Sequence, residues 1–253
     1  MKKVYYLLCC LLTFAVTSCE YDNYNGPSET LKGKVVDVNT GKPIQAQIGD
    51  DGIRLKLLEY SWSDNPEPYW FTTIQDGTFN NTKIFKGEYN VEVIGPFVPI
   101  YQFDSKGNVT VDERQTVEIK GTTDLTFKVE PFLNVEWVGE PVINPDRTIS
   151  VQVKITRGTS NTKYHKRIAD LRLFINSSSP YVGDNNYHQV YTNHLQGDNA
   201  NNALDNVVTL KTNGKLPEGR TWYLRVGARI DYANESDGKR RYNYNEPISI
   251  KVP

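Results

Sequence analysis

Apolar and polar side chains alternate along most of the chain, in runs that are short. A period of two is typical of strands with one buried face. In the first half of the chain, the runs that fit a strand are 31–38, 53–60, 69–74, 78–85, 88–94 and 125–129. In the second half they are 132–138, 148–156, 171–176, 207–211, 220–232 and 247–252. No stretch of comparable length carries a convincing helical stripe, so the pattern predicts an all-β fold.

Turn-forming residues separate these runs and divide the chain into two units. Gly, Asn, Asp and Pro gather at 39–43, 76–77, 86–87 and 105–108, where they favour tight turns. Pro131 closes one series of strands before the next begins. We therefore predict two tandem β-sandwiches, the first over residues 29–131 and the second over 132–253.

The balance of charge argues against nucleic acid as a partner. The 29 basic and 30 acidic residues leave a net charge of -1, so the chain has no strong field that would attract a phosphate backbone. Tyrosine is abundant, at 16 of 253 residues, which suits a β-rich protein because aromatic side chains pack well on pleated sheets.

The N-terminus has the organisation of an export signal. Lys2 and Lys3 precede an apolar run over residues 4–16. A run of about 13 residues is in the range of the apolar part of a signal peptide and is too short to cross a bilayer. We predict that residues 1–18 are a signal peptide.

The end of that segment, VTSC at 16–19, resembles the lipobox of bacterial lipoproteins. The resemblance implies that Cys19 is diacylated and becomes the mature N-terminus. Cys9 and Cys10 lie in the removed segment, so no thiol pair would remain. More than one acyl chain suffices for stable anchoring, so we expect a membrane contact through the lipid and a polar tether over 19–28. The alternative is an ordinary secretory signal that happens to contain Cys19.

Three motifs in the first unit occur in an order that resembles a known fold. They are GKVVDVNTGKPI at 33–44, DGTF at 76–79, and the spaced residues Gly87, Tyr89, Val91 and Val93. Together they resemble the carboxypeptidase regulatory-like, or transthyretin-like (prealbumin-like), β-sandwich. Tyr89, Val91 and Val93 share one face of a strand, as that fold requires.

The second unit is similar to an immunoglobulin-like or fibronectin type III sandwich. LPEGRTWYLRV at 216–226 resembles the corner and the following strand of fibronectin type III domains, in which a tyrosine ties the corner to the sheet. Here Trp222 lies on the face of Leu224 and Val226, in the place of that tyrosine.

The phrase DGTFNNTKIFKGEYNVEVIGPFVP at 76–99, with the lipobox and a second β unit, resembles a family of surface lipoproteins of unknown function. Such proteins come from bacteria with Sus-type glycan-uptake systems. The resemblance implies an outer-membrane location, exposed at the cell surface, with the periplasmic face left open. It implies a neighbourhood more than an activity, with an outer-membrane transporter and its lipoprotein lid as expected partners. A polysaccharide or oligosaccharide is the ligand that we expect from the aromatic loops described below.

Catalytic motifs are absent from the sequence. The three histidines are not spaced as a metal pair, and no HExxH, CxxC, P-loop or GxSxG occurs. We expect no enzymatic activity, no cofactor and no metal site.

Two aromatic loops are the candidate binding sites. The first, at 60–70, holds Trp62, Tyr69 and Trp70, and the second, within the long polar segment 177–205, holds Tyr181, Tyr187 and Tyr191. Aromatic rings beside amides and carboxylates suit sugars, whose apolar faces stack while hydroxyls need directional partners. The rings could equally plug the sandwich ends or pack between the two units. The functional hypothesis is an accessory glycan-binding or scaffolding lipoprotein. The alternatives are a structural spacer or protein-interaction module without sugar binding and, with less support, a hydrolase.

We expect mass spectrometry of the protein isolated from its cells to find a diacylated Cys19 at the mature N-terminus. An unmodified thiol at this position, or a protein found free in the cytosol, would contradict the lipid anchor.

Overall fold

The computed structural model describes residues 25–253. The predicted signal peptide at 1–18, the lipidation site Cys19 and most of the tether at 19–28 lie outside the described residues. No helix in the described part of the chain has the length and apolar character needed to span a membrane.

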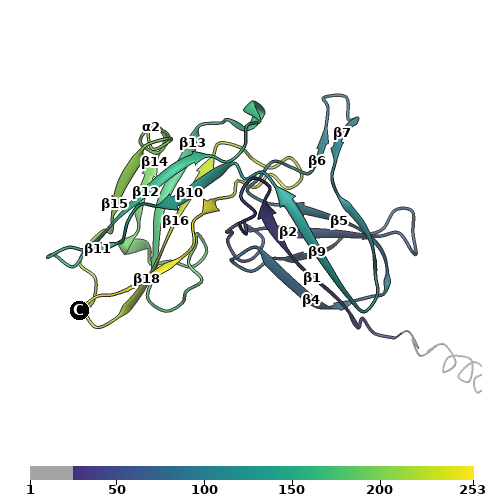
Figure 1. The fold of residues 1–253 in the computed structure, drawn as a ribbon, viewed down its shortest axis with the longest axis horizontal. Coiled ribbons are helices and arrows are strands. Elements are labelled where there is room, and N and C mark those ends of the chain that lie inside the picture. Colours follow the sequence, from purple (N-terminus) through teal and green to yellow (C-terminus); the bar gives the residue numbers. More distant parts are fainter. Residues whose placement is uncertain (1–24) are drawn as a thin grey trace, which may run out of the picture.

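The first unit is a sandwich of two sheets with a projecting hairpin (Figure 1). One sheet has the order β4 (Thr78–Ile84), β1 (Glu29–Asp37), β9 (Thr122–Val129), with β1 and β9 parallel. The other has the order β3 (Tyr69–Thr72), β2 (Arg54–Glu59), β5 (Gly87–Ile94), β8 (Gln115–Ile119). The hairpin consists of β6 (Tyr101–Phe103) and β7 (Val109–Asp112).

Alternation along these strands builds the first core. Leu55 and Leu57 of β2 pair with Val93 and Val91 of β5, and all four are buried between the sheets. Tyr89 lies on the same face of β5 and is also buried. The predicted period of two is therefore confirmed, because each strand turns every second side chain inward.

The second unit is also a sandwich. Its first sheet contains β10 (Leu133–Trp137), β12 (Ile149–Arg157), β11 (Val142–Ile143) and β15 (Val207–Lys211). Its second sheet contains β14 (Asn193–Gln196), β13 (Ile168–Asn176), β16 (Thr221–Ile230), β17 (Asn243–Tyr244) and β18 (Ile248–Lys251). Single helical turns lie at η1 (Thr162–Tyr164), η2 (Gln189–Tyr191) and α2 (Asp198–Asn201). The predicted all-β class with tandem sandwiches is confirmed.

Trp222 anchors the corner of the second unit. Its side chain is buried in the core, and Nε1 donates to the carbonyl oxygen of Pro217 at 3.5 Å. A corner tyrosine in related sandwiches ties the turn to the sheet in the same sense, by a bond back to the upstream backbone. The Trp222 indole therefore anchors the corner to the sheet, as the sequence pattern predicted.

The polar segment 177–205 is more ordered than its sequence pattern indicates. We predicted no strand in it, but β14 pairs with β13 in antiparallel register from Leu173↔Asn193 to Asp170↔Gln196. β14 is only four residues long and has one apolar side chain, Leu195, so no alternation marks it in the sequence. Upstream, residues 180–186 lie against the first unit, where Gln75 donates to the carbonyl oxygen of Pro180 at 3.2 Å.

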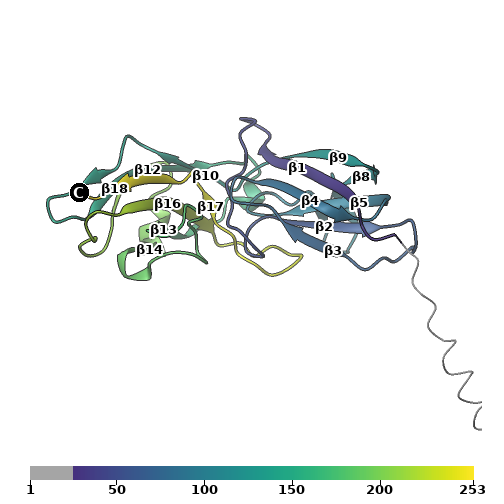
Figure 2. The same cartoon turned by 90° about the horizontal axis from the view of Figure 1, so that it is seen from below.

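The two sandwiches lie end to end along the long axis of the molecule (Figures 1 and 2). The described chain enters at the end of the first unit that faces away from the second, and the C-terminus lies at the far end of the second unit (Figure 1). Strand β1 runs from that entry toward the boundary between the units, which we call the seam.

The buried guanidinium of Arg225 joins the two units at the seam. Arg225 of β16 is fully buried and its guanidinium lies 4.3 Å from the ring centre of Tyr244. It donates hydrogen bonds to the backbone oxygens of Ala46 (2.8 Å), Asn245 (2.9 Å), Val182 (3.1 Å) and Gln75 (3.4 Å), and to Oε1 of Gln45 (3.3 Å). Desolvation lowers the pKa of Arg225 to about 10, so the group is still charged at neutral pH.

Further hydrogen bonds cross the seam beside this cation. Asn243 donates to the carbonyl oxygen of Pro96 at 2.8 Å, and the Tyr244 hydroxyl donates to Oε1 of Gln47 at 2.9 Å. Arg241 donates to the carbonyl oxygen of Gly52 at 2.8 Å. The units are thus joined by a polar network whose partners are mostly buried, which fixes their relative orientation.

We expect Arg225→Met to destabilise the protein by about 3 kcal/mol, because buried carbonyl oxygens of both units lose their donor. Urea unfolding measures this loss. The matched control is Arg220→Met, at an exposed arginine that forms no ion pair with any residue of 25–253, which we expect to change stability by less than about 0.5 kcal/mol. Equal effects of the two substitutions would contradict the role of Arg225.

Candidate functional site

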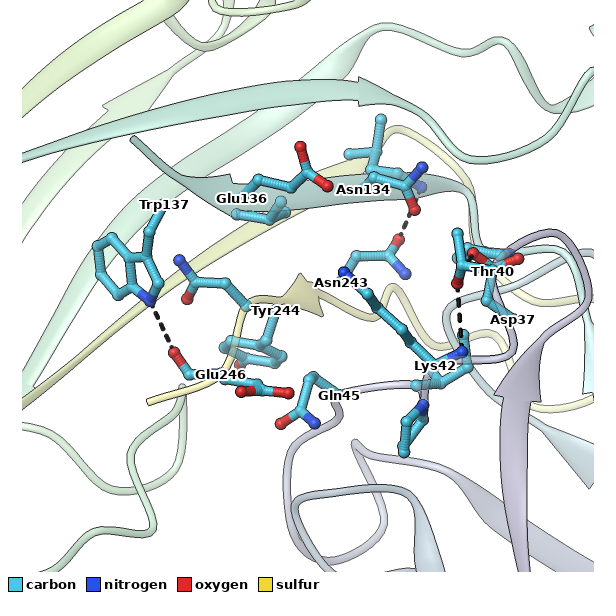
Figure 3. Close-up of a pocket in the computed structure, with 16 residues that line it drawn as sticks. Asp37, Thr40, Lys42, Gln45, Asn134, Glu136, Trp137, Asn243, Tyr244 and Glu246 are labelled. Atoms are coloured by element: carbon cyan, nitrogen blue, oxygen red, sulfur yellow. Dashed lines mark hydrogen bonds between the residues drawn. The ribbon is translucent and has the colours of Figure 1, made fainter. Parts of the chain in front are cut away.

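A hollow at the seam lies between three segments from both units (Figure 3). We call it the seam cleft; it has a volume of about 410 Å³ and is lined by parts of 37–45, 131–137 and 243–246. The first segment is the turn after β1, the second is β10 and the residues before it, and the third is β17 and the residues after it. This volume is in the range of small-ligand sites.

Trp137 supplies the aromatic face of the seam cleft. It ends β10, is half-buried, and packs partly on the core of the second unit. Its Nε1 donates to the carbonyl oxygen of Glu246 at 2.9 Å, which fixes the indole. Figure 3 shows Trp137 at one end of the seam cleft and Thr40 and Lys42 at the other. A Trp held in this way presents a rigid surface on which an apolar ligand face can stack.

Amide side chains line the floor of the seam cleft, and most of them are already engaged. Asn243 accepts from the backbone N–H of Leu133 at 3.1 Å and donates to Pro96. Asn245 accepts from the backbone N–H of Val226 at 2.8 Å. Its Nδ2 is different: it is buried and makes no hydrogen bond to another described residue. A buried amide donor without an acceptor is uncommon in folded proteins and calls for an explanation.

Acidic side chains dominate the charge of the seam cleft. Asp37 is buried and accepts from the backbone N–H of Asn39 at 2.9 Å and from the hydroxyl of Thr40 at 2.8 Å. Glu136 and Glu246 are exposed, and none of the ion pairs in residues 25–253 includes them. Tyr244 lies beneath, and complete burial raises the pKa of its hydroxyl far above the usual value. The cleft therefore offers acceptors on free side chains and a tyrosine that stays neutral.

Chemically, these groups can hold an uncharged, hydroxyl-rich molecule. One aromatic ring and two carboxylates free of ion pairs line a hollow whose walls are fixed by the buried network of the seam. In residues 25–253, no group of three or more His, Cys, Asp or Glu side chains is placed to hold a metal ion.

A family model described as the N-terminal domain of a protein of unknown function, DUF3823, matches residues 29–130. A solved structure of a DUF3823 family protein from Bacteroides uniformis is 38% identical to the chain, with a TM-score of 0.83, covering 90% of this chain and 100% of that one. The chain belongs to the DUF3823 family. The predicted membership of a family of unknown function is thereby confirmed. Among curated proteins, no sequence matches the chain.

More distant solved structures share the fold of this DUF3823 chain. One, described as a candidate carbohydrate-binding protein from Bacteroides uniformis, is 20% identical with a TM-score of 0.69, over 90% of this chain and 100% of that one. A DUF3823 family protein from Parabacteroides merdae is also 20% identical, with a TM-score of 0.61 and the same coverage. At this identity the similarity establishes the fold.

The first aromatic loop of the DUF3823 chain lies outside the seam cleft. Arg54, at the start of β2, reaches Asp237 of the second unit, whereas the loop follows the opposite end of this strand. Trp62 is 66% exposed and Tyr69 46% exposed. Trp70 is half-buried under the guanidinium of Arg54, 4.1 Å from its ring centre. None of these three rings lines a hollow that the second loop also lines.

In the second aromatic loop, two tyrosines pack within the second unit and the third lines hollows beside the seam. Tyr187 packs on Phe174 and Tyr191 packs on Trp222, each with ring centres 5.3 Å apart. Tyr181 is 48% exposed and lines two smaller hollows beside the seam cleft, of about 370 and 200 Å³. Of the six aromatic residues predicted from the sequence, Tyr181 is the one that lines these hollows, whereas Trp70 reaches the boundary only through Arg54.

Sequence reasoning missed Trp137, Asn245 and Gln45 as candidate site residues. Trp137 carries a weak signal, because it ends an alternating run where the strand leaves the core. Nothing local marks the other two, since their segments are about 200 residues apart and meet only through the docking of the units.

Proposed function

We propose that this protein is a non-catalytic, lipid-anchored envelope protein that holds a glycan at the seam. The observation that carries the proposal is the half-buried indole of Trp137, held by the backbone of Glu246 in a cleft that also presents the carboxylates of Glu136 and Glu246 free of ion pairs. The apolar face of a sugar ring can stack on this indole while its hydroxyls bind polar groups of the lining. Glu136 and Glu246 add acceptors for the remaining hydroxyls.

Rigidity of the seam favours binding. The network around Arg225 holds Gln45 and the backbone of Asn245 before any ligand arrives. A preformed site does not have to order its own side chains on binding, so more of the interaction energy appears as affinity. The description of one distant relative as a candidate carbohydrate-binding protein supports the same function.

The lipobox-like VTSC at 16–19 supports a place at the envelope. We propose that Cys19 carries the lipid and that the protein is an accessory component of an outer-membrane polysaccharide-uptake system, exposed at the cell surface. Its partners there would be the transporter and its lipoprotein lid. The periplasmic face of the same membrane is the alternative placement.

A structural spacer is the second candidate function. The observation that favours it is the end-to-end arrangement, with the described N-terminal end and the C-terminus at opposite poles of a rigidly joined pair (Figure 1). A spacer needs no ligand, so glycan binding separates the two candidates.

We expect the purified protein to bind at least one member of a panel of polysaccharides in affinity electrophoresis. Trp137→Ala should weaken this binding about tenfold or more, because it removes the stacking face. Trp62→Ala, at an exposed indole outside the seam, serves as the matched control and should leave binding within about twofold. Thermal unfolding of both variants verifies that they remain folded.

Two outcomes would contradict the proposal. Binding that survives Trp137→Ala but is lost in Trp62→Ala would move the site to the loop at 60–70. A protein that binds no polysaccharide of the panel would favour the spacer.

A further inference from the structure

The seam cleft continues into two neighbouring hollows. It shares Pro43, Gln45 and Glu246 with the hollow of about 370 Å³, which in turn shares Gln75 and Tyr181 with the hollow of about 200 Å³. We call the three together the seam groove. Trp137 borders the first hollow and Tyr181 the other two, so the groove offers aromatic rings at separate positions along its length.

The lining of the seam groove is poor in groups that bind anions. Its acidic side chains are Asp37, Asp76, Glu136 and Glu246, and its one basic side chain is Lys42. Arg225 lies beneath and offsets part of this charge, but each of its nitrogens already donates to a protein oxygen. No guanidinium among the lining residues can therefore form the paired bonds that carboxylates and sulfates favour.

Carboxylates in the groove would repel an anionic ligand and attract the hydroxyls of a neutral one. Glu136 and Glu246 are free of ion pairs, so each can accept charge-assisted hydrogen bonds from hydroxyl donors. The same two groups raise the free energy of a uronate or sulfate placed beside them, and this repulsion weakens with salt.

We infer that the seam groove selects neutral glycan chains of more than one sugar residue and discriminates against glycans that carry carboxylate or sulfate. The inference rests on the proposed function, because it assigns the ligand class of the same site. Trp137 stacks one sugar, the free carboxylates of the lining bind hydroxyls along the chain, and Tyr181 meets a sugar further along it.

The test compares matched pairs of glycans. Each neutral polysaccharide that the protein binds is compared with its own oxidised form, in which primary hydroxyls have become carboxylates. We expect the oxidised form to bind at least about tenfold more weakly in 20 mM salt, and the ratio to shrink in 0.5 M salt as screening increases. Polygalacturonate and a sulfated polysaccharide extend the comparison.

A double variant assigns the discrimination to the groove. Glu136→Gln with Glu246→Gln should reduce the affinity ratio between the neutral and oxidised forms by about threefold or more. The matched control, Glu88→Gln with Glu118→Gln, changes two exposed carboxylates outside the groove and should leave the ratio unchanged. Tyr181→Ala should weaken binding of a hexasaccharide more than binding of a disaccharide.

The outcomes separate this inference from the proposed function. An oxidised or sulfated glycan that binds as tightly as the neutral form, and is lost in Trp137→Ala, would overturn the neutral selectivity and leave glycan binding at the seam intact. Neutral binding that Trp137→Ala does not weaken would overturn the site itself. A ratio that both double variants change equally would also overturn the role of the groove carboxylates.

Discussion

One buried guanidinium sets the relation between the two sandwiches. Arg225 belongs to the second unit, yet three of its acceptors, Gln45, Ala46 and Gln75, belong to the first. It has no carboxylate partner among the described residues, so its charge is balanced by carbonyl dipoles and by the ring of Tyr244. A cation taken out of water is costly unless every donor is used, and Nη2 of Arg225 finds its acceptors, Gln45 and Gln75, only when both units are docked. The docked arrangement is therefore the state in which this cost is smallest.

The segment 180–186 completes the same constraint. Arg225 donates to the carbonyl oxygen of Val182, Gln47 accepts from the backbone N–H of Asp184 at 2.8 Å, and Asn185 donates to the carbonyl oxygen of Ile48 at 2.8 Å. A polar stretch without alternation thus forms part of the joint between the units. Its exposed Tyr181 borders the seam because the residues on either side of it are held there.

Local patterns were enough to predict most of the architecture. Alternation located the strands that carry Leu55, Val91 and Val153, because burial of every second residue is a property of each strand alone. Trp222 was recognised from its place after a corner leucine. The candidate site could not be predicted in this way. Asn245 and Trp137 gain their roles from contacts between segments that are far apart in sequence. Tyr187 and Tyr191 were predicted to bind a ligand because they lie in a polar loop rich in aromatic residues. Their rings instead pack on Phe174 and Trp222, and this tertiary packing leaves no local pattern in the sequence.

The course of β1 sets the distance between the predicted membrane anchor and the seam cleft. This strand begins with Glu29 at the pole where the described chain enters, and it ends with Asp37 in the wall of the seam cleft. Nine residues at about 3.3 Å each span about 30 Å. With an acyl anchor at Cys19, the first sandwich would act as a pedestal of that height, lifting the opening clear of the lipid headgroups and toward polymers that diffuse past the cell.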